Sequence, residues 1–385
     1  MRKEIEFLIS CVRDSAEANR EEIEKTLRSQ SFDWTYLIDT ADIHGLMPLL
    51  YRKLRTSYSQ NVPKDILDDL RQHFHHNSWQ NALKTEELSR LLGLFSAHKI
   101  PAVVYKGPVL AAFAYGNLSL RQFGDLDILF HERDIQKVKE LLLQQGYTPE
   151  LQLNSSQEKI YNRFQRDLNF TSDDGKVAVE IQWDIPPRYF PFSFTLDSLR
   201  ERIQTVSLEN KEFFTFSPED TLIILCIHGL YHCWERAGWI CDVAKLIEAY
   251  PIMNWEFVLS QAEALKSEQS LYLGLCLVQA LFKTPYPKNI RERMREDNVS
   301  RAIASKIQDN LFSEKEDLSR PIKCVFSQIR TWKRLRDKVF FCFHLAVNPN
   351  PEDWKLLKLP SLFSFLYALI RPIRLLFTYG WRTVK

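Results

Sequence analysis

Residues 106–130 read KGPVLAAFAYGNLSLRQFGDLDILF, and the last six positions predict a strand with one polar and one apolar face. Because side chains alternate along a strand, Asp125 and Asp127 lie on one face, and Leu126, Ile128 and Phe130 take the other. Two neighbouring carboxylates repel each other and are costly to desolvate unless a cation lies between them. Mg²⁺ suits such a pair, since it binds one or two carboxylates together with substrate phosphates. The alternative is an edge strand whose polar face meets water.

The composition predicts a globular protein that is rich in helix. The chain has 385 residues, of which 45% are hydrophobic and 26% charged, the balance of a folded globular protein. That length allows two or three domains. The chain has 11 glycines, fewer than a turn-rich all-β fold would use. The formal net charge of +2 gives no whole-molecule argument for binding nucleic acid.

The cysteines and the N-terminal stretch predict a cytoplasmic protein. Seven cysteines are scattered without regular spacing from Cys11 to Cys342. The first residues, MRKEIEFLIS, are charged from the start, which is not the pattern of a signal peptide, so we expect reduced thiols. No uninterrupted apolar run is as long as a membrane-spanning helix.

Residues 1–97 are predicted to form an N-terminal helical region. Apolar residues recur there at helical spacing, and Pro63 marks the start of a helical stretch that becomes long and amphipathic towards residue 97. His73, His75 and His76 fall within that stretch. They have little support from other ligands, so a solvated helix surface is favoured over a metal site.

Residues 98–215 are predicted to form an α/β core. A short β-type run over 102–105 is followed by a helix over 108–115. The strand with the two aspartates comes next, then an amphipathic helix over 134–145 that a glycine caps. Strand, helix, strand and helix in that order indicate an α/β arrangement.

Two further β-type runs, residues 168–171 and 176–183, are predicted to form a hairpin. The sequence Ser-Asp-Asp-Gly between them has the composition of a hairpin turn. In the second run, bulky apolar residues alternate with Ala178, Glu180 and Gln182. If this small-residue face is turned toward the aspartate strand, Glu180 adds a third carboxylate. The alternative is the solvated face of an isolated hairpin.

Residues 216–385 are predicted to form a C-terminal helical domain. Amphipathic helices are expected over 219–232, 234–250 and 255–282, and the charge-rich stretch 283–320 is expected to be helix with a connection.

Two histidines of this region, His228 and His232, are four residues apart and share a helix face. Cys226, Cys233 and Cys241 lie nearby in the sequence and permit zinc, but they form no closed four-ligand set. A polar helix face turned toward the core site is therefore favoured over a zinc site.

The C-terminal tail is predicted to contain a loop at 348–354 that opens a helix, then an apolar stretch over 362–376. Arg371-Pro372 and Arg374 interrupt that stretch, so it is too short and too charged to span a bilayer. Packing back on the helical body is favoured over lying on an anionic membrane surface.

Five motifs in a fixed order resemble a known superfamily. They are Lys106-Gly107; Arg121; Gly124-Asp125-Leu126-Asp127-Ile128-Leu129; Val179-Glu180-Ile181-Gln182-Trp183; and His228-Gly-x-x-His232-x-Trp234 followed by Trp239-x-x-Asp242. Together they resemble the polymerase-β-type nucleotidyltransferase superfamily, and more closely its bacterial branch of little-characterised nucleotidyltransferase-family proteins. Asp353-Trp354 and Arg371-Pro372 are similar to that branch too, so the resemblance covers most of the chain.

This resemblance implies an α+β fold, helix-rich overall, with a small mixed-sheet nucleotidyltransferase core between N-terminal and C-terminal helical regions. It implies an EC 2.7.7-type enzyme that moves a nucleoside monophosphate from a nucleoside triphosphate, such as ATP, to a hydroxyl group and releases pyrophosphate. The acceptor is a small molecule, a peptide or protein, or a sugar. The implied cofactor is Mg²⁺ or Mn²⁺.

The implied site residues are those at the matching positions of this sequence. Asp125, Asp127 and Glu180 are the catalytic and metal-binding residues; Lys106, Gly107 and Arg121 are the nucleotide-binding residues; His228, His232 and Asp242 are candidates for the lining of the substrate cleft.

The sequence departs from the family pattern at two positions. Where the superfamily has a glycine followed by glycine or serine, this chain has Gly107-Pro108, and proline removes a backbone donor that could hold a phosphate. Lys106 or Arg121 would then supply that contact. Where the branch carries a histidine two residues after the third acid, this chain has Gln182.

Two other functions are compatible with the same residues. One is a catalytically silent nucleotide-binding or regulatory module, such as the antitoxin-like half of a pair. The other is a transferase that adds nucleotides to an RNA end, for which a basic groove with aromatic residues is expected. Residues 323–338 are basic and contain Trp332, but a charged helix face explains them equally well, so nucleic acid ranks last among the partners.

Overall fold

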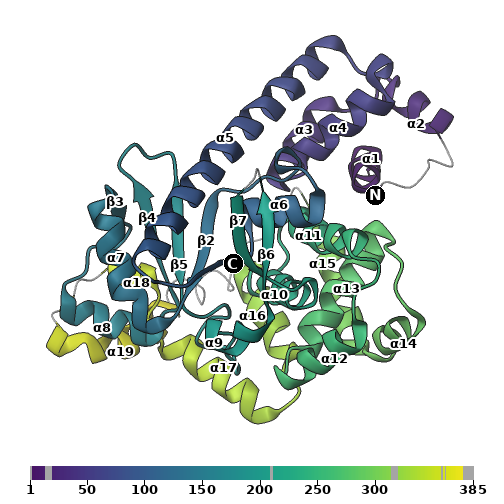
Figure 1. Cartoon of the computed structure of the whole chain (residues 1–385). Helices are drawn as coiled ribbons and strands as arrows, with labels where there is room; N and C mark the ends of the chain where they lie inside the picture. The colour runs from purple at the N-terminus through teal and green to yellow at the C-terminus, as the bar shows by residue number, and fades with distance from the viewer. Residues whose placement is uncertain are drawn as a thin grey trace.

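A mixed sheet lies between two groups of helices in the part of the chain that the computed structural model describes, residues 2–13, 20–208, 211–313, 320–356, 359 and 361–375 (Figure 1). The sheet has five strands in the order β1-β2-β5-β4-β3, and β6 and β7 form a separate hairpin. The predicted helix-rich α+β architecture is confirmed. The strands are β1 (Ala102–Val104), β2 (Asp125–Phe130), β3 (Tyr147–Pro149), β4 (Asp167–Ser172), β5 (Ala178–Gln182), β6 (Ile203–Leu208) and β7 (Lys211–Phe216).

The N-terminal helices lead into α5, which runs from them to the sheet (Figure 1). These helices are α1 (Lys3–Val12), α2 (Arg20–Leu27), α3 (Trp34–Ile43), α4 (Met47–Ser57) and α5 (Lys64–Ala97). Helices α6 (Gly107–Tyr115), α7 (Ile135–Gln144), α8 (Ser155–Phe164) and α9 (Leu196–Leu199) belong to the core.

The C-terminal helices follow β7. They are α10 (Pro218–Tyr231), α11 (Ala237–Ala249), α12 (Trp255–Ala264), α13 (Glu268–Phe282), α14 (Lys288–Glu296), α15 (Asn298–Leu311), α16 (Arg320–Thr331), α17 (Leu335–Val347), α18 (Pro351–Leu356) and α19 (Tyr367–Leu375). The division into residues 1–97, 98–215 and 216–385 stays a prediction. Its first junction falls between α5 and β1, and its second falls at the end of β7.

The register of the sheet brings acidic positions of separate strands together. β2 and β5 are parallel neighbours, with Asp127 opposite Glu180. β4 pairs antiparallel with β5, which confirms the predicted hairpin. Gly175 in its turn has a φ of 72°, a conformation that favours glycine, and its N–H donates to the Ser172 oxygen at 2.8 Å.

The two faces of the sheet are covered by different helices. On one face, Leu126 and Ile128 of β2 pack with Leu88 and Leu91 of α5 in a buried cluster that also includes α7 residues. On the other face, Leu129 belongs to a second cluster together with residues of β7 and α10. Because side chains alternate, the aspartates of β2 share the face of Leu129, toward the C-terminal helices.

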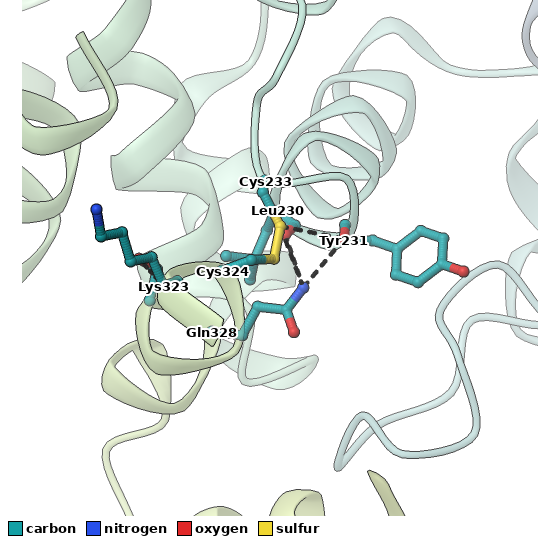
Figure 2. The surroundings of a disulfide bond; sticks show 7 residues. Leu230, Tyr231, Cys233, Lys323, Cys324 and Gln328 are labelled. Atoms are coloured by element: carbon teal, nitrogen blue, oxygen red, sulfur yellow. Dashed lines mark hydrogen bonds between the residues drawn. A yellow bond between two sulfur atoms is a disulfide. The ribbon is translucent and has the colours of Figure 1, made fainter. Parts of the chain in front are cut away.

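A disulfide bond joins the end of α10 to α16 (Figure 2). Cys233 and Cys324 are separated by 91 residues, and their Cα atoms are 5.6 Å apart, within the range of protein disulfides. Beside the bond, the Gln328 amide donates to the carbonyl oxygens of Leu230 and Tyr231, both at 3.0 Å. The sequence predicts reduced thiols at all seven cysteines. The structure differs from this prediction at Cys233 and Cys324, because the fold places these two distant residues in contact.

The end of the described chain packs back on the body, as the sequence predicts. The Arg371 guanidinium donates to the Asp353 carboxylate at 2.7 Å, and Trp354 is buried against the rings of Tyr161 and Tyr367. Residue 376, the last of the predicted apolar stretch, lies outside the described residues. None of the described helices is long and apolar enough to cross a membrane.

Candidate active site

Asp125 and Asp127 occupy the first and third positions of β2. The apolar face of the strand, with Leu126, Ile128 and Phe130 fully buried, sets its orientation, and alternation turns both carboxylates to the opposite face. Asp127 is 4% exposed, whereas Asp125 is exposed at the start of the strand. The two acids therefore share one face in different surroundings.

The third predicted acid, Glu180, lies on the same face of the sheet. It is the register partner of Asp127 on the neighbouring parallel strand, and residues directly opposite each other in a sheet point to the same side. Its sequence neighbours Val179 and Ile181 are buried on the other face. The sheet thus brings together three carboxylates from two strands.

Gln182 and Lys106 connect these carboxylates by hydrogen bonds. The Lys106 ammonium donates to Asp127 Oδ1 at 3.1 Å, and the Gln182 amide donates to the same oxygen at 3.1 Å and to Glu180. The Tyr105 hydroxyl donates to the amide oxygen of Gln182, which fixes the amide so that its NH₂ group faces the acids. Gln182, which departs from the family pattern, therefore acts as the link between Asp127 and Glu180.

Burial and repulsion by neighbouring carboxylates shift Asp125 and Glu180 toward their neutral forms. Burial, followed by the charges of Asp167 and Asp127, raises the pKa of Glu180 to about 8. The charge of Asp127, followed by burial, raises the pKa of Asp125. Burial, the largest single effect, lowers the pKa of Lys106, but the charges of Asp127 and of the other acidic groups around it together raise this pKa. The site therefore keeps Lys106 charged and disfavours further negative charge.

Two charged residues of this face, Arg166 and Asp167, were not among the predicted site residues. Asp167 opens β4 opposite Gln182, and its charge contributes to the raised pKa of Glu180. Arg166 is buried, donates to the backbone oxygen of Ile185, and lies 5.2 Å from the ring centre of Tyr231. The sequence feature that could have identified them is their position as a charged pair directly before the predicted strand 168–171.

Gly107 forms the turn between β1 and α6. Its φ of 55° lies in the left-handed region that favours glycine, and an added Cβ would lie 3.6 Å from the backbone oxygen of Asp125. Pro108 stands in the first turn of α6, so one backbone N–H is missing there. The positive charge at this turn comes from Lys106.

Arg121 and Asp242, predicted for different roles, form a bidentate ion pair. Nε of Arg121 donates to Oδ1 of Asp242 at 2.8 Å, and Nη2 donates to Oδ2 at 2.9 Å. The Tyr115 hydroxyl donates to the same Oδ1 at 2.7 Å. Nη1 of Arg121 is buried without a hydrogen-bond partner among the described residues. The pair joins the segment that precedes β2 to α11.

His228 and His232 lie on one side of the α10 terminus, with ring centres 4.4 Å apart. The ring of Trp239 lies 5.5 Å from the first and 5.0 Å from the second. Burial, followed by the charge of Lys106, lowers the pKa of both histidines, that of His232 to about 3. Both imidazoles are therefore neutral at physiological pH. Cys233, a ligand in the zinc alternative, is bonded to Cys324.

A cavity of about 370 Å³ adjoins the start of β2. Its wall includes Asn77 and Lys84 of α5, Arg121 and Gly124 of the core, and Trp239 of α11. All three predicted regions of the chain thus contribute to one polar cavity next to Asp125.

The carboxylates of this face are the oxygen ligands that Mg²⁺ prefers. A cation beside Asp125 and Asp127 would relieve the repulsion that raises the pKa of Asp125. Within the described ranges, no group of three or more His, Cys, Asp or Glu side chains is arranged to hold a metal ion. The residues therefore fit a site in which two aspartates, water and substrate phosphates complete the ligand set.

Most of the chain matches one known protein family. The sequence model of a family described as "Uncharacterised nucleotidyltransferase" matches residues 30–283, a range that contains every predicted site residue. A crystal structure of the lincosamide antibiotic adenylyltransferase LnuA, bound to lincomycin, is similar over 42% of this chain and 94% of that chain, with 18% sequence identity and a TM-score of 0.29. No curated protein matches the chain.

Proposed function

Because this chain belongs to the uncharacterised nucleotidyltransferase family, we propose that it transfers a nucleoside monophosphate from a nucleoside triphosphate to a hydroxyl-bearing acceptor. The acceptor oxygen attacks the α-phosphorus, the bond from that phosphorus to the bridging oxygen breaks, and pyrophosphate leaves with that oxygen. The acceptor is a small molecule, a peptide or protein, or a sugar. The observation that carries the proposal is the register that sets Glu180 opposite Asp127, on the strand face that also carries Asp125.

Asp125 and Asp127 would hold Mg²⁺ or Mn²⁺, and Glu180 would complete the site on the acceptor side. When bound, the metal supplies charge neutralisation at the phosphates and lowers the pKa of the acceptor hydroxyl. Lys106 stays bonded to Asp127 and keeps that carboxylate in place.

In this scheme Glu180 accepts the proton of the acceptor hydroxyl in its ionised form, which a bound metal cation would favour over the protonated form of the metal-free site. Gln182 donates to it and to Asp127, so one amide orients both carboxylates. The Tyr105 hydroxyl, which is bonded to the amide oxygen, prevents the amide from turning its oxygen toward the acids.

Lys106, Gly107 and Arg121 are the proposed phosphate-binding residues. Lys106 lies at the turn before α6, and Gly107 adopts the left-handed backbone conformation that this turn requires. Arg121 is held by Asp242 through two of its nitrogens, so Nη1 is the group that remains to donate to a phosphate oxygen.

His228 and His232 are proposed to line the acceptor side of the cleft. As neutral imidazoles beside Trp239, they offer hydrogen bonds to a hydroxyl-bearing acceptor without adding charge. Asp242 acts in the cleft by fixing Arg121.

The test follows phosphorus label from the nucleotide into a new product. Purified protein, Mg²⁺ or Mn²⁺ and each nucleoside triphosphate, labelled at the α- or the γ-phosphate, are incubated with a lysate of the source cells. A variant with both Asp125→Asn and Asp127→Asn is the control. α-Label in a new species, absent with the control, supports nucleotidyl transfer and tags the acceptor. Transfer of γ-label alone would indicate a kinase-like reaction and refute the proposal.

A second measurement separates the role of Glu180 from those of the phosphate-binding residues. Glu180→Gln should lower turnover more than nucleotide affinity, because its partner is the acceptor. A variant that loses affinity and keeps turnover would remove Glu180 from the acceptor side. Nucleotide binding without any transfer would favour the regulatory module instead.

A further inference from the structure

Lys84 of α5 is a buried cation that the predicted site did not include. Its surface is 8% exposed, and its ammonium donates to the backbone oxygen of Phe123 at 2.8 Å. It forms no ion pair with a carboxylate of the described chain, whereas Lys106 pairs with Asp127 and Arg121 with Asp242. A buried ammonium with an uncharged partner is costly to a fold.

The charge of Asp125 acts on Lys84 from a distance, without an ion pair. Burial lowers its pKa, and the charge of Asp125 opposes this effect. Asp125 itself is the exposed acid of the proposed metal pair. A phosphate group near both residues would supply the missing negative charge to Lys84.

Lys84 lies in the wall of the 370 Å³ cavity that adjoins Gly124. Of the acidic groups in that wall, Asp242 is bonded to Arg121, and Asp42 is an exposed residue of α3. Arg236, exposed at the start of α11, adds positive charge to the wall. The cavity wall therefore holds more basic than acidic side chains, which favours an anion.

The wall opposite α5 is held in place by contacts between distant parts of the chain. The N–H groups of Ala237 and Gly238 donate to Nδ1 and to the backbone oxygen of His44, at 3.1 and 2.9 Å. A Cβ on Gly238 would lie 2.6 Å from that oxygen, so the backbones are in close contact. This part of the cavity wall is thus formed by closely packed backbone of the α3–α4 connection and α11.

We propose that Lys84 contacts the triphosphate of the nucleotide in this cavity, as a phosphate-binding residue contributed by the N-terminal helical region. The proposal rests on the proposed function and extends it. The triphosphate is favoured over an anionic acceptor because the cavity wall includes Gly124, directly before Asp125, and a metal held by the aspartates is shared with substrate phosphates.

The test measures how the contribution of Lys84 to affinity depends on the number of phosphates. Calorimetry with Mg²⁺ first identifies which of ATP, GTP, CTP and UTP the wild-type protein binds most tightly. The dissociation constants of that triphosphate, its diphosphate, its monophosphate and its nucleoside are then compared for wild type and Lys84→Met. The matched control is Lys64→Met, an exposed lysine on the same helix.

Lys84→Met is expected to weaken triphosphate binding about 10- to 100-fold, the range of one charge-assisted hydrogen bond. The loss should shrink as phosphates are removed and vanish for the nucleoside, and Lys64→Met should bind like the wild type. Equal losses for all four ligands, or triphosphate binding at the wild-type level, would overturn the proposal. Wild type that binds no triphosphate would instead refute the proposed function, and this inference with it.

Two further variants separate phosphate binding from support of the Phe123 backbone. Lys84→Arg keeps the charge and should restore most of the triphosphate affinity. Lys84→Gln keeps a donor for the Phe123 oxygen but removes the charge, and it should retain the thermal stability of the free protein while binding triphosphate weakly. A Lys84→Gln variant with wild-type triphosphate affinity would show that Lys84 has only a structural role.

Discussion

Arg121 and Asp242, 121 residues apart in the sequence, meet in a bidentate ion pair with both N–O distances below 3 Å. Arg121 lies shortly before β2 and Asp242 lies on α11, so the pair connects the strand that carries the aspartates to the C-terminal helices. Tyr115 adds a third hydrogen bond to the carboxylate. The two family motifs that contain these residues are therefore parts of one contact.

Substitution of either member of this pair should destabilise the protein. Asp242 is buried and the Arg121 side chain is only 11% exposed, so removal of one partner leaves the other charge uncompensated, which costs about 3–5 kcal/mol. Arg121→Met and Asp242→Leu together should cost much less than the sum of the single substitutions. Urea unfolding of the wild type, the two single variants and the double variant measures the coupling free energy between the two residues. Losses of stability that simply add up in the double variant would show that the ion pair contributes no stability.

Asp125→Asn and Asp127→Asn should both abolish nucleotidyl transfer, with losses of at least about 10²–10³-fold, but should differ in stability. Asp125→Asn removes the repulsion that raises the pKa of Asp125, so the metal-free protein should unfold at a higher temperature. Asp127→Asn removes the counter-charge of the buried Lys106, so its melting temperature should fall. Calorimetric scans and the α-label assay check both parts, and an active Asp127→Asn variant would contradict the metal assignment.

Glu180 should make the metal-free protein less stable as the pH rises. Its pKa is about 8 in the folded protein, against an ordinary value of 4.5. The folded state therefore keeps a proton that the unfolded state has released, and the free energy of unfolding falls between these two pKa values. Glu180→Gln should flatten this decline.

Urea unfolding at several pH values between about 5 and 8 measures this effect. Glu86→Gln, at an exposed position of α5, is the control and should follow the wild-type curve. A Glu180→Gln curve that runs parallel to the wild type would show that Glu180 is already ionised across this range.

The Cys233–Cys324 bond should contribute several kcal/mol of stability in oxidising buffer. A bond that closes a loop of 91 residues removes about 4–5 kcal/mol of chain entropy from the unfolded state in the loop-closure estimate. Cys324→Ser should therefore lower the melting temperature, whereas Cys342→Ser, at an exposed free thiol, should not. The unfolded, unreduced protein should expose five thiols, and a count of seven would show that the bond is absent.

The sequence identified most of the local structure because the relevant signals lie within a few residues. The alternation in Asp125–Phe130 predicted both the strand and the face of its acids, and the Ser-Asp-Asp-Gly turn predicted the β4–β5 hairpin. The alternation in residues 176–183 indicated Glu180, and the resemblance added Lys106 and Arg121. It did not indicate Lys84 or Asp167, whose positions near the acids depend on how α5 and β4 pack.

The sequence by itself determined which residues share a strand or helix face, since side-chain periodicity is a property of the local backbone. The tertiary structure decided which faces meet. The parallel register of β2 and β5 set Asp127 opposite Glu180, and the packing of α11 on the core joined Asp242 to Arg121. It also placed Cys233 beside Cys324 and left Lys84 without a carboxylate partner among the described residues. Such contacts arise from the burial of apolar surface over the whole chain, which a short stretch of sequence does not encode.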